Sequence, residues 1–457
     1  MRKVGGGVGV ETDPAAIAAA VVEMMRNGRF ADLEGLFAPS LRAVVSAGTL
    51  EVAWESQMSG IGAVSAVGPP IRESGAQAGL VRVSVPVTCE RGGLTVVMSV
   101  GETGLLHGLR LAPALTGRWT PPPYAVPRRF GEHEVTVGSG ELAVPGTLSV
   151  PRGRGPWPGV VLLSGGGPFD RDAASGPNKP LKDLAWGLAG RGVAVLRFDK
   201  VTCVHAGQVA ARPDFTMTDE YVPHAVAAVR LLQRHPAVDA GRVYVAGHSM
   251  GGKVAPRVAV AEPSVAGLVL LAADSEPMHH AAVRVVRHLA AVSPGPAADA
   301  AVEAITRQAA LVDSPGLSAA TAASDLPFGY SGAYWLDLRG YDPVATAAAS
   351  GKPMLILQGG RDYQVTVEDD LSRWRAGLAH RADVTIRVYD ADDHMFFSGS
   401  GPSTPADYES PQHVDPAVVA DIADWLAPRR GGMARLVSRL GRTFGIVFDG
   451  VRGPGIR

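Results

Sequence analysis

The sequence predicts a small α+β unit followed by a larger α/β unit that is built on a parallel sheet. Three observations support this division. The chain has 457 residues, more than one ordinary hydrophobic core contains. Helical periodicity followed by period-two alternation occupies its beginning, whereas short branched apolar runs separated by helix-length segments occupy the rest. We therefore expect two domains of different architecture.

The first unit is predicted to span residues 1–117. After the potential N-cap Asp13, apolar residues recur at helical spacing. Two further helical stretches follow, and then two alternating runs are joined by a turn at residues 90–93. The expected helices cover residues 14–25, 33–45 and 50–58, and the expected antiparallel strands cover residues 81–87 and 94–100. Helices followed by a small meander are typical of an α+β domain.

A proline-rich linker is predicted at residues 118–129, since prolines interrupt both helices and central strands. The α/β unit is predicted to cover residues 130–428, and a basic tail to cover residues 429–457. We interpret the tail as a peripheral extension, with weak contact to an anionic surface as the alternative.

Within the α/β unit, five short apolar runs are rich in branched residues, as expected for strands buried on both faces. They lie at residues 158–163, 193–198, 243–246, 265–271 and 353–357, and helix-length segments separate the first four. This order predicts a parallel sheet with crossover helices. The long gap before the fifth run contains helical patterns and an aromatic-rich piece, which predicts an inserted lid at about residues 275–349.

The strand at residues 243–246 runs directly into Gly247-His248-Ser249-Met250-Gly251, and a helical pattern begins at once. Strand, sharp turn and helix are the context that a Gly-x-Ser-x-Gly nucleophile elbow requires. Glycines flank such a serine because its turn is strained and crowded. Ser249 is therefore the candidate nucleophile.

Two other interpretations compete for this segment. Residues 247–253 also match most of a phosphate-binding loop, but Val254 occupies the place of the hydroxyl that would hold magnesium. A turn with only a structural role is the remaining alternative.

An isolated serine hydroxyl is a poor nucleophile, so a base and an orienting acid should follow it in the order Ser, Asp, His. Asp362 comes just after the strand at residues 353–357, at the carboxyl edge of the sheet where ligand sites lie. His394 follows the next strand, at residues 384–389. We predict Asp362 as the acid and His394 as the base, although a histidine there could also be a loop residue or a helix cap.

Three other acids near His394 could compete for the orienting role: Asp390, Asp392 and Asp393. Carboxylates so close in sequence to the histidine more often cap the following backbone. Asp362 is therefore preferred.

An oxyanion hole needs two backbone donors. One should be the N–H of Met250, which follows the nucleophile, and the other should come from the loop after the first long strand. That loop, residues 164–172, contains three consecutive glycines that allow close approach to a substrate. We predict the N–H of Gly166 as the second donor.

These residues together bring out a family resemblance. The chain from residue 135 to residue 427 resembles bacterial α/β-hydrolase esterases, in which a strand ends in a Gly-rich P-x-D-R-D loop and an L-R-Y-D-K-R-G segment follows. The G-H-S-x-G-G segment, the G-x-x-D strand end and a D-H-x-F ending also match. The matching residues of the first and last motifs are Pro168, Asp170, Arg171, Asp172, Asp393, His394 and Phe396.

The resemblance implies an α/β-hydrolase fold with this triad, and it is not specific for a substrate. The sequence departs from the pattern at Val201-Thr202-Cys203, where R-G is expected after Lys200, so the segment around Cys203 and His205 is open and could face the site. The N-terminal unit looks like the small cone-like α+β domain of unknown function that often precedes such hydrolases.

Composition excludes other classes of function. Lys and Arg number 43 against 44 Asp and Glu, so nothing suggests a nucleic-acid partner. The start lacks the apolar segment of a signal peptide and no run reaches 18 apolar residues, so we expect a cytoplasmic protein without stable membrane insertion. Cys89 and Cys203 form neither a disulfide framework nor a zinc site, and we expect no cofactor and no metal.

The predicted function is a serine hydrolase that cleaves a carboxylic ester or thioester of a small acyl substrate through an acyl-enzyme on Ser249. A lyase or cyclase on the same fold is the alternative, motivated by the divergent segment at residues 201–205 and the aromatic residues near Tyr334. A binding protein with an inactive triad is a third hypothesis. The N-terminal unit could gate the pocket, bind a partner or pair two subunits into a homo-oligomer.

Overall fold

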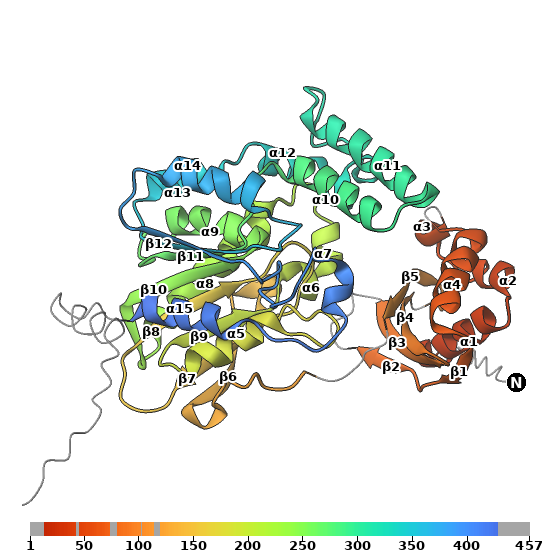
Figure 1. Cartoon of the computed structure of the whole chain (residues 1–457), viewed down its shortest axis with the longest axis horizontal. Helices are drawn as coiled ribbons and strands as arrows, with labels where there is room; N and C mark the ends of the chain where they lie inside the picture. Colours follow the sequence, from red (N-terminus) through yellow and green to blue (C-terminus); the bar gives the residue numbers. More distant parts are fainter. Residues whose placement is uncertain (1–12, 43–44, 74–79, 102, 114–118, 428–457) are drawn as a thin grey trace, which may run out of the picture.

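The computed structural model describes residues 13–42, 45–73, 80–101, 103–113 and 119–427 (Figure 1). These residues form two separate β-sheets, one antiparallel with five strands and one mixed with eight strands. The predicted basic tail at residues 429–457 and the first residue of the predicted linker lie outside the described residues.

The smaller sheet belongs to the N-terminal part of the chain, with the strand order β1-β3-β4-β5 and β2 paired to β3. Alternate side chains of β3 and β4 point to one face, where they pack with helices in a core drawn from residues 17–111. The elements are α1 (Pro14–Arg26), α2 (Phe30–Glu34), α3 (Pro39–Arg42), α4 (Ala47–Ile61), β1 (Val64–Val67), β2 (Ile71–Glu73), β3 (Leu80–Cys89), β4 (Gly92–Gly101) and β5 (Leu106–Pro113).

The prediction of one helix at residues 33–45 is wrong in extent, because two short helices, α2 and α3, occupy this part of the chain. Between them the backbone leaves the helical hydrogen-bond pattern and pairs with the start of β5. Ala38 N–H donates to the Leu106 carbonyl at 2.8 Å, and Leu106 N–H donates to the Leu36 carbonyl at 2.8 Å. A pairing with a residue this distant in sequence is invisible to local periodicity.

The larger sheet has the strand order β13-β12-β11-β10-β8-β9-β7-β6. Its six central and C-terminal strands are parallel, as predicted, whereas β6 and β7 form an antiparallel hairpin at one edge. The strands predicted from the sequence do not include this hairpin. The strands are β6 (Phe130–Val137), β7 (Val144–Pro151), β8 (Trp157–Leu163), β9 (Ala194–Phe198), β10 (Val238–His248), β11 (Leu268–Leu271), β12 (Met354–Gly359) and β13 (Val384–Tyr389).

Helices cover both faces of the larger sheet, which confirms the α/β class. One buried apolar cluster joins the sheet to α8, α9 and α14, and a second cluster joins its other face to α5 and α15. The helices in question are α5 (Pro180–Ala189), α6 (Val201–Val204), α7 (Ala206–Ala210), α8 (Met217–Arg234), α9 (Met250–Ala261), α14 (Ser372–Leu378) and α15 (Pro416–Leu426).

Four helices lie between β11 and β12, in the segment where the sequence predicts an insertion: α10 (Met278–Val292), α11 (Pro296–Asp313), α12 (Gly332–Arg339) and α13 (Pro343–Ser350). Helices α10 and α11 pack side by side at the top of Figure 1. The described part of the proline-rich segment is also held in place, since Trp119 donates its indole N–H to Asp183 of α5 at 2.8 Å.

Candidate active site

Ser249 stands at the junction of β10 and α9 with φ 54° and ψ −124°, a conformation that residues other than glycine rarely adopt. The turn leaves no room beside it. A Cβ on Gly247 would lie 2.1 Å from the Gly251 carbonyl oxygen, and a Cβ on Gly251 would lie 2.6 Å from the Leu163 carbonyl oxygen. The elbow is therefore possible only with glycine at both positions, and its strain is a feature of functional sites.

Asp362 and His394 lie together at the carboxyl edge of the sheet. Asp362 follows β12, His394 follows β13, and the imidazole Nδ1 lies 2.7 Å from Asp362 Oδ2. Both side chains are almost fully buried. The carboxylate accepts the Nδ1–H and so leaves the Nε2 nitrogen of His394 free to act as a base.

The Asp362 carboxylate is held by donors from its own loop. Its Oδ1 accepts the backbone N–H groups of Gln364 and Val365 at 2.8 and 2.9 Å. Its Oδ2 accepts the side-chain amide of Gln358 at 3.2 Å in addition to the imidazole. These bonds fix the direction in which the carboxylate faces His394.

Burial by itself lowers the pKa of His394, but the charge and hydrogen bond of Asp362 outweigh it, and the net pKa is raised. Burial lowers the pKa of the neighbouring His248 to about 3, so this imidazole is neutral. His248 Nε2–H donates to the His394 carbonyl at 2.8 Å, and the two ring centroids are 4.7 Å apart. His248, the residue before Ser249, thus ties the histidine loop to the elbow.

Ser249 itself donates its backbone N–H to the Leu271 carbonyl at 2.9 Å. Within the part of the chain that the structure describes, its hydroxyl makes no hydrogen bond to His394. Such bonds are often long before a substrate is present.

Among the described residues, none of the three other candidate acids shares a hydrogen bond with the imidazole. Asp393 Oδ1 accepts the N–H groups of Met395 and Phe397 at 2.8 and 3.0 Å. Asp392 Oδ1 accepts the Ser398 hydroxyl at 2.7 Å, and Asp390 is exposed. Burial raises the pKa of Asp392 and of Asp393 to about 6. Asp393 thus caps the backbone of its own loop.

The two predicted oxyanion donors lie on either side of the elbow. Met250 is the first residue of α9, where a backbone N–H has no intrahelical partner. The glycine loop approaches from β8: a Cβ on Gly165 would lie 3.2 Å from Ser249 Cβ, and a Cβ on Gly166 would lie 3.4 Å from Met250 Cε. Among the described residues, the N–H groups of Met250 and Gly166 have no acceptor.

A buried lysine and a buried tyrosine hold the glycine loop from behind. Lys200 Nζ and the Tyr221 hydroxyl donate to the Gly165 carbonyl at 3.0 and 2.7 Å, and Lys200 Nζ also contacts Tyr221 Oη at 2.8 Å. In a trans peptide the carbonyl and the following N–H point in opposite directions. Fixing the Gly165 carbonyl toward Lys200 therefore directs the Gly166 N–H to the opposite side of the loop.

Lys200 is completely buried, and burial lowers its pKa despite the ion pair with Glu220 at 2.8 Å. The other carboxylate oxygen of Glu220 accepts the hydroxyl of Tyr334 at 2.5 Å, and Tyr334 also contacts Met250 Sδ at 3.5 Å. This chain of contacts connects the glycine loop to α12 of the inserted segment.

The charged residues of the loop motifs pair with one another. Arg171 donates to the two carboxylate oxygens of Asp199 through Nε and Nη2 at 3.0 and 3.1 Å, and Asp172 accepts Arg197 Nε at 2.8 Å. Burial alone would raise the pKa of Asp172, but the guanidinium of Arg197 lowers it. These ion pairs join the loop after β8 to the end of β9.

The divergent segment after Lys200 forms the short helix α6. His205 Nε2–H donates to the Ala143 carbonyl at 2.9 Å, next to β7, and Thr202 donates its hydroxyl to Glu220 at 2.7 Å. Cys203 is partly buried, and burial raises the pKa of its thiol. Through Thr202, the segment after Lys200 thus helps to hold Glu220, the ion-pair partner of Lys200.

The lysine of the rival phosphate-loop interpretation is also occupied. Lys253 is buried and its ammonium group pairs with Asp274 at 3.2 Å and donates to the Glu276 carbonyl at 3.0 Å. A phosphate-binding lysine would face an open loop instead.

The site residues predicted from the sequence do not include Lys200, Tyr221 or His248. Lys200 stands in a recognised motif, which was the available signal. Tyr221 lies on α8, and no local sequence pattern places its hydroxyl near Gly165, which is 56 residues earlier in the chain.

The chain is similar in sequence to known hydrolases. A model of the serine aminopeptidase S33 family of hydrolases matches residues 179–399. Esterase EstD of Thermotoga maritima is 33% identical over 338 residues, which cover 74% of this chain and 77% of that protein.

Matches among solved structures include Est1E from Butyrivibrio proteoclasticus, at 15% identity and a TM-score of 0.42, covering 65% of this chain and 99% of that one. A Pyrococcus furiosus esterase has 16% identity and a TM-score of 0.40, covering 68% and 94%. Within the described part of this chain, no helix combines the length and the apolar character needed to cross a bilayer.

Proposed function

Because this chain belongs to the α/β-hydrolase family of esterases and is a carboxylic ester hydrolase, we propose that it cleaves a small ester or thioester through an acyl-enzyme on Ser249. The observation that carries the proposal is the buried Asp362–His394 pair, with 2.7 Å between carboxylate and imidazole, tied by His248 to the strained serine turn. A nucleophile, its base and the orienting acid are the parts that acyl transfer needs.

In the first step, His394 Nε2 takes the hydroxyl proton of Ser249 while Oγ attacks the acyl carbon. The carbonyl electron pair moves onto oxygen, and the N–H groups of Met250 and Gly166 stabilise the resulting oxyanion. Collapse of the tetrahedral intermediate expels the alcohol or thiol, which takes the proton from His394. Water then repeats the sequence and releases the acid.

Asp362 keeps the proton of His394 on Nδ1 and stabilises the imidazolium that forms in each step. Lys200 and Tyr221 act one layer further out as positioning residues, because they hold the Gly165 carbonyl and thereby aim the Gly166 N–H. We further propose that residues 1–117 and 130–428 are separate domains and that residues 275–349 are a lid, whose Tyr334 contacts Met250.

We expect Lys200→Met to lower kcat about 10²- to 10³-fold with little change in KM, the effect of losing one oriented oxyanion donor. The reason is that substrate binding does not use the oxyanion, whereas the transition state does. Tyr221→Phe should give a smaller loss, because Lys200 still holds the same carbonyl.

The matched control is Lys352→Met, since Lys352 also donates to a backbone carbonyl, that of Pro263, at 2.6 Å, but on the exposed surface. Steady-state kinetics on a short-chain ester, with thermal denaturation of each variant, separates catalysis from stability. Equal losses in kcat and 1/KM, or no loss at all, would contradict the positioning role.

The pH profile provides another prediction. His394 acts as a base only when neutral, and its pKa is raised above the ordinary value of 6.5, so kcat/KM should rise with pH and level off only above that value. The Asp393 carboxylate contributes to this raised pKa. Asp393→Asn should therefore move the acid limb to lower pH. Measuring kcat/KM from about pH 5 to about pH 9 tests both statements, and an acid limb moved upward in Asp393→Asn would refute the second.

A lyase or cyclase on the same fold need not form an acyl-enzyme. Intact-protein mass spectrometry after treatment with a fluorophosphonate decides between the two chemistries. An adduct on Ser249 supports hydrolysis. If instead no adduct formed and Ser249→Ala kept full activity, the reaction would be non-covalent and the hydrolytic proposal would be wrong.

A further inference from the structure

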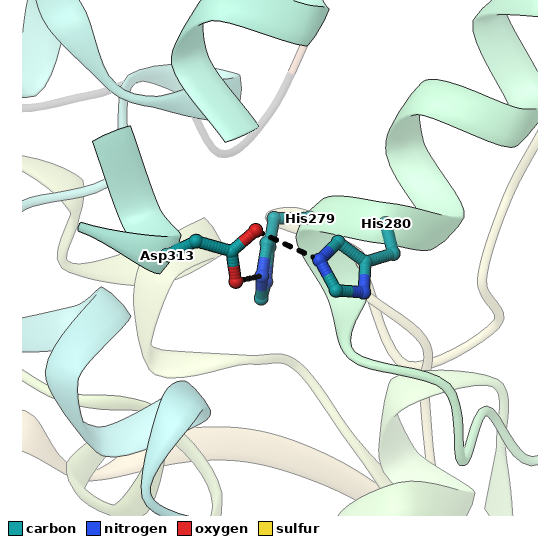
Figure 2. Close-up of side chains that lie close together, drawn as sticks. All are labelled: His279, His280 and Asp313. Carbon is teal, nitrogen blue, oxygen red and sulfur yellow. Dashed lines mark hydrogen bonds and ion pairs between the residues drawn. The ribbon is translucent and has the colours of Figure 1, made fainter. Parts of the chain in front are cut away.

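Two histidines and an aspartate converge where α10 begins and α11 ends. His279 Nε2 lies 2.7 Å from Asp313 Oδ1, and His280 Nε2 lies 2.9 Å from Asp313 Oδ2. Figure 2 shows both imidazoles directed at the one carboxylate, with ring centroids 4.2 Å apart. One ligand atom from each residue lies within 4.8 Å of the others.

We propose that His279, His280 and Asp313 form a binding site for a transition-metal ion of the zinc type. Two imidazole nitrogens and one carboxylate oxygen suit Zn²⁺, whereas Ca²⁺ and Mg²⁺ prefer oxygen ligands alone. Three protein ligands leave one tetrahedral position for water. On binding, each neutral imidazole offers the Nε2 electron pair and carries its proton on Nδ1, so the ion replaces the two N–H donors that now face the carboxylate.

Binding of an ion requires a shift of the ligand atoms. Zinc–ligand bonds of about 2.0–2.1 Å in a tetrahedron separate neighbouring ligand atoms by about 3.3 Å. The contacts of 2.7 and 2.9 Å go to different oxygens of Asp313 and would have to lengthen, and the ligand atoms now lie within 4.8 Å of one another. Asp313 can supply this shift, because its side chain is half exposed at the end of a helix. His280 is similarly exposed, which leaves a path for the ion.

The backbones that carry the three ligands are held on both sides. His279 is buried and its ring meets the edge of Trp335 at 6.0 Å between centroids. Arg339 Nη1 donates to the carbonyls of Val312 and Ser314, at 2.8 and 2.9 Å, which are the residues before and after Asp313. A ligand set held in this way loses little conformational freedom when an ion binds.

Space for the ion and its fourth ligand lies beside the cluster. All three side chains line a cavity of about 570 Å³ that also reaches Tyr341 and Arg373. Because His279 and His280 begin α10 and Asp313 ends α11, a bound ion would cross-link the two ends of this helix pair. The expected consequence is a more stable inserted segment, independent of the proposed acyl-transfer chemistry.

The test uses the full chain, freed of any histidine tag and stripped of metal with a chelator. Calorimetric titration with Zn²⁺ should show one equivalent bound with a Kd of about 10 μM or tighter, and saturating Zn²⁺ should raise Tm by about 2 °C or more. Co²⁺, used as a probe, should show the strong visible absorption of a tetrahedral site.

His280→Ala and Asp313→Asn should each weaken Zn²⁺ binding about tenfold or more, while exposed His380→Ala should leave it unchanged. His280→Ala is the least disruptive of the ligand variants because the side chain is half exposed. Absence of binding at about 100 μM Zn²⁺, unchanged binding in both ligand variants, or loss of binding when Cys203 is alkylated would each overturn the proposal.

Discussion

Ser249→Ala should reduce esterase turnover by about 10⁴-fold or more, because it removes the oxygen that forms the covalent bond to the acyl carbon. The residual rate should come from the backbone donors, which still stabilise an oxyanion when water attacks directly. The backbone strain at φ 54° is retained with alanine, so the fold and Tm should change little. The loss should appear in kcat and not in KM.

Two measurements on the same preparations check this result. Hydrolysis of a short-chain ester gives the rate, and a fluorophosphonate adduct seen by mass spectrometry should be present in the parent and absent in Ser249→Ala. Ser264→Ala is the control, since this serine bonds Glu262 at the far end of α9. A variant at Ser249 with more than about a tenth of the parent rate would exclude the acyl-enzyme route.

Asp362→Asn should lower kcat by about 10⁴-fold. Asparagine presents an amide N–H as well as a carbonyl oxygen, so it can bond His394 Nδ1 whether or not this nitrogen carries the proton. It therefore no longer enforces the Nδ1–H tautomer. It also removes the negative charge that raises the pKa of His394, so the small remaining activity should have an acid limb at lower pH. The amide can keep the bonds from Gln364 and Val365, which limits the loss of stability.

Asp393→Asn is the matched comparison, because Asp393 is a buried carboxylate adjacent to His394 that accepts two backbone N–H groups and, among the described residues, shares no hydrogen bond with the imidazole. We expect it to retain most of the parent kcat at pH values above the acid limb. If Asp393→Asn lost as much activity as Asp362→Asn, the orienting role would have to be shared between the two carboxylates.

Local sequence signals were sufficient to predict the elements whose hydrogen bonds are local. They were also sufficient for site residues whose position follows from the order of the strands along the chain. Short branched apolar runs predicted the parallel strands, since burial on both faces imposes that composition. The glycines around Ser249 predicted the elbow, because any Cβ at Gly247 or Gly251 would collide with a backbone carbonyl. Strand ends in a parallel sheet share one edge, so Asp362 and His394 could be assigned to the same site from their order alone.

Other features depend on contacts between distant segments, which no periodicity encodes. The helix expected at residues 33–45 is divided because Ala38 pairs with Leu106, and the Gly165 carbonyl is held by Lys200 and Tyr221 from two other elements. The sequence indicated no metal site, since His279 and His280 are separated from Asp313 by most of two helices. Packing of α10 on α11 brings these three side chains together, so only the tertiary structure decides their chemistry.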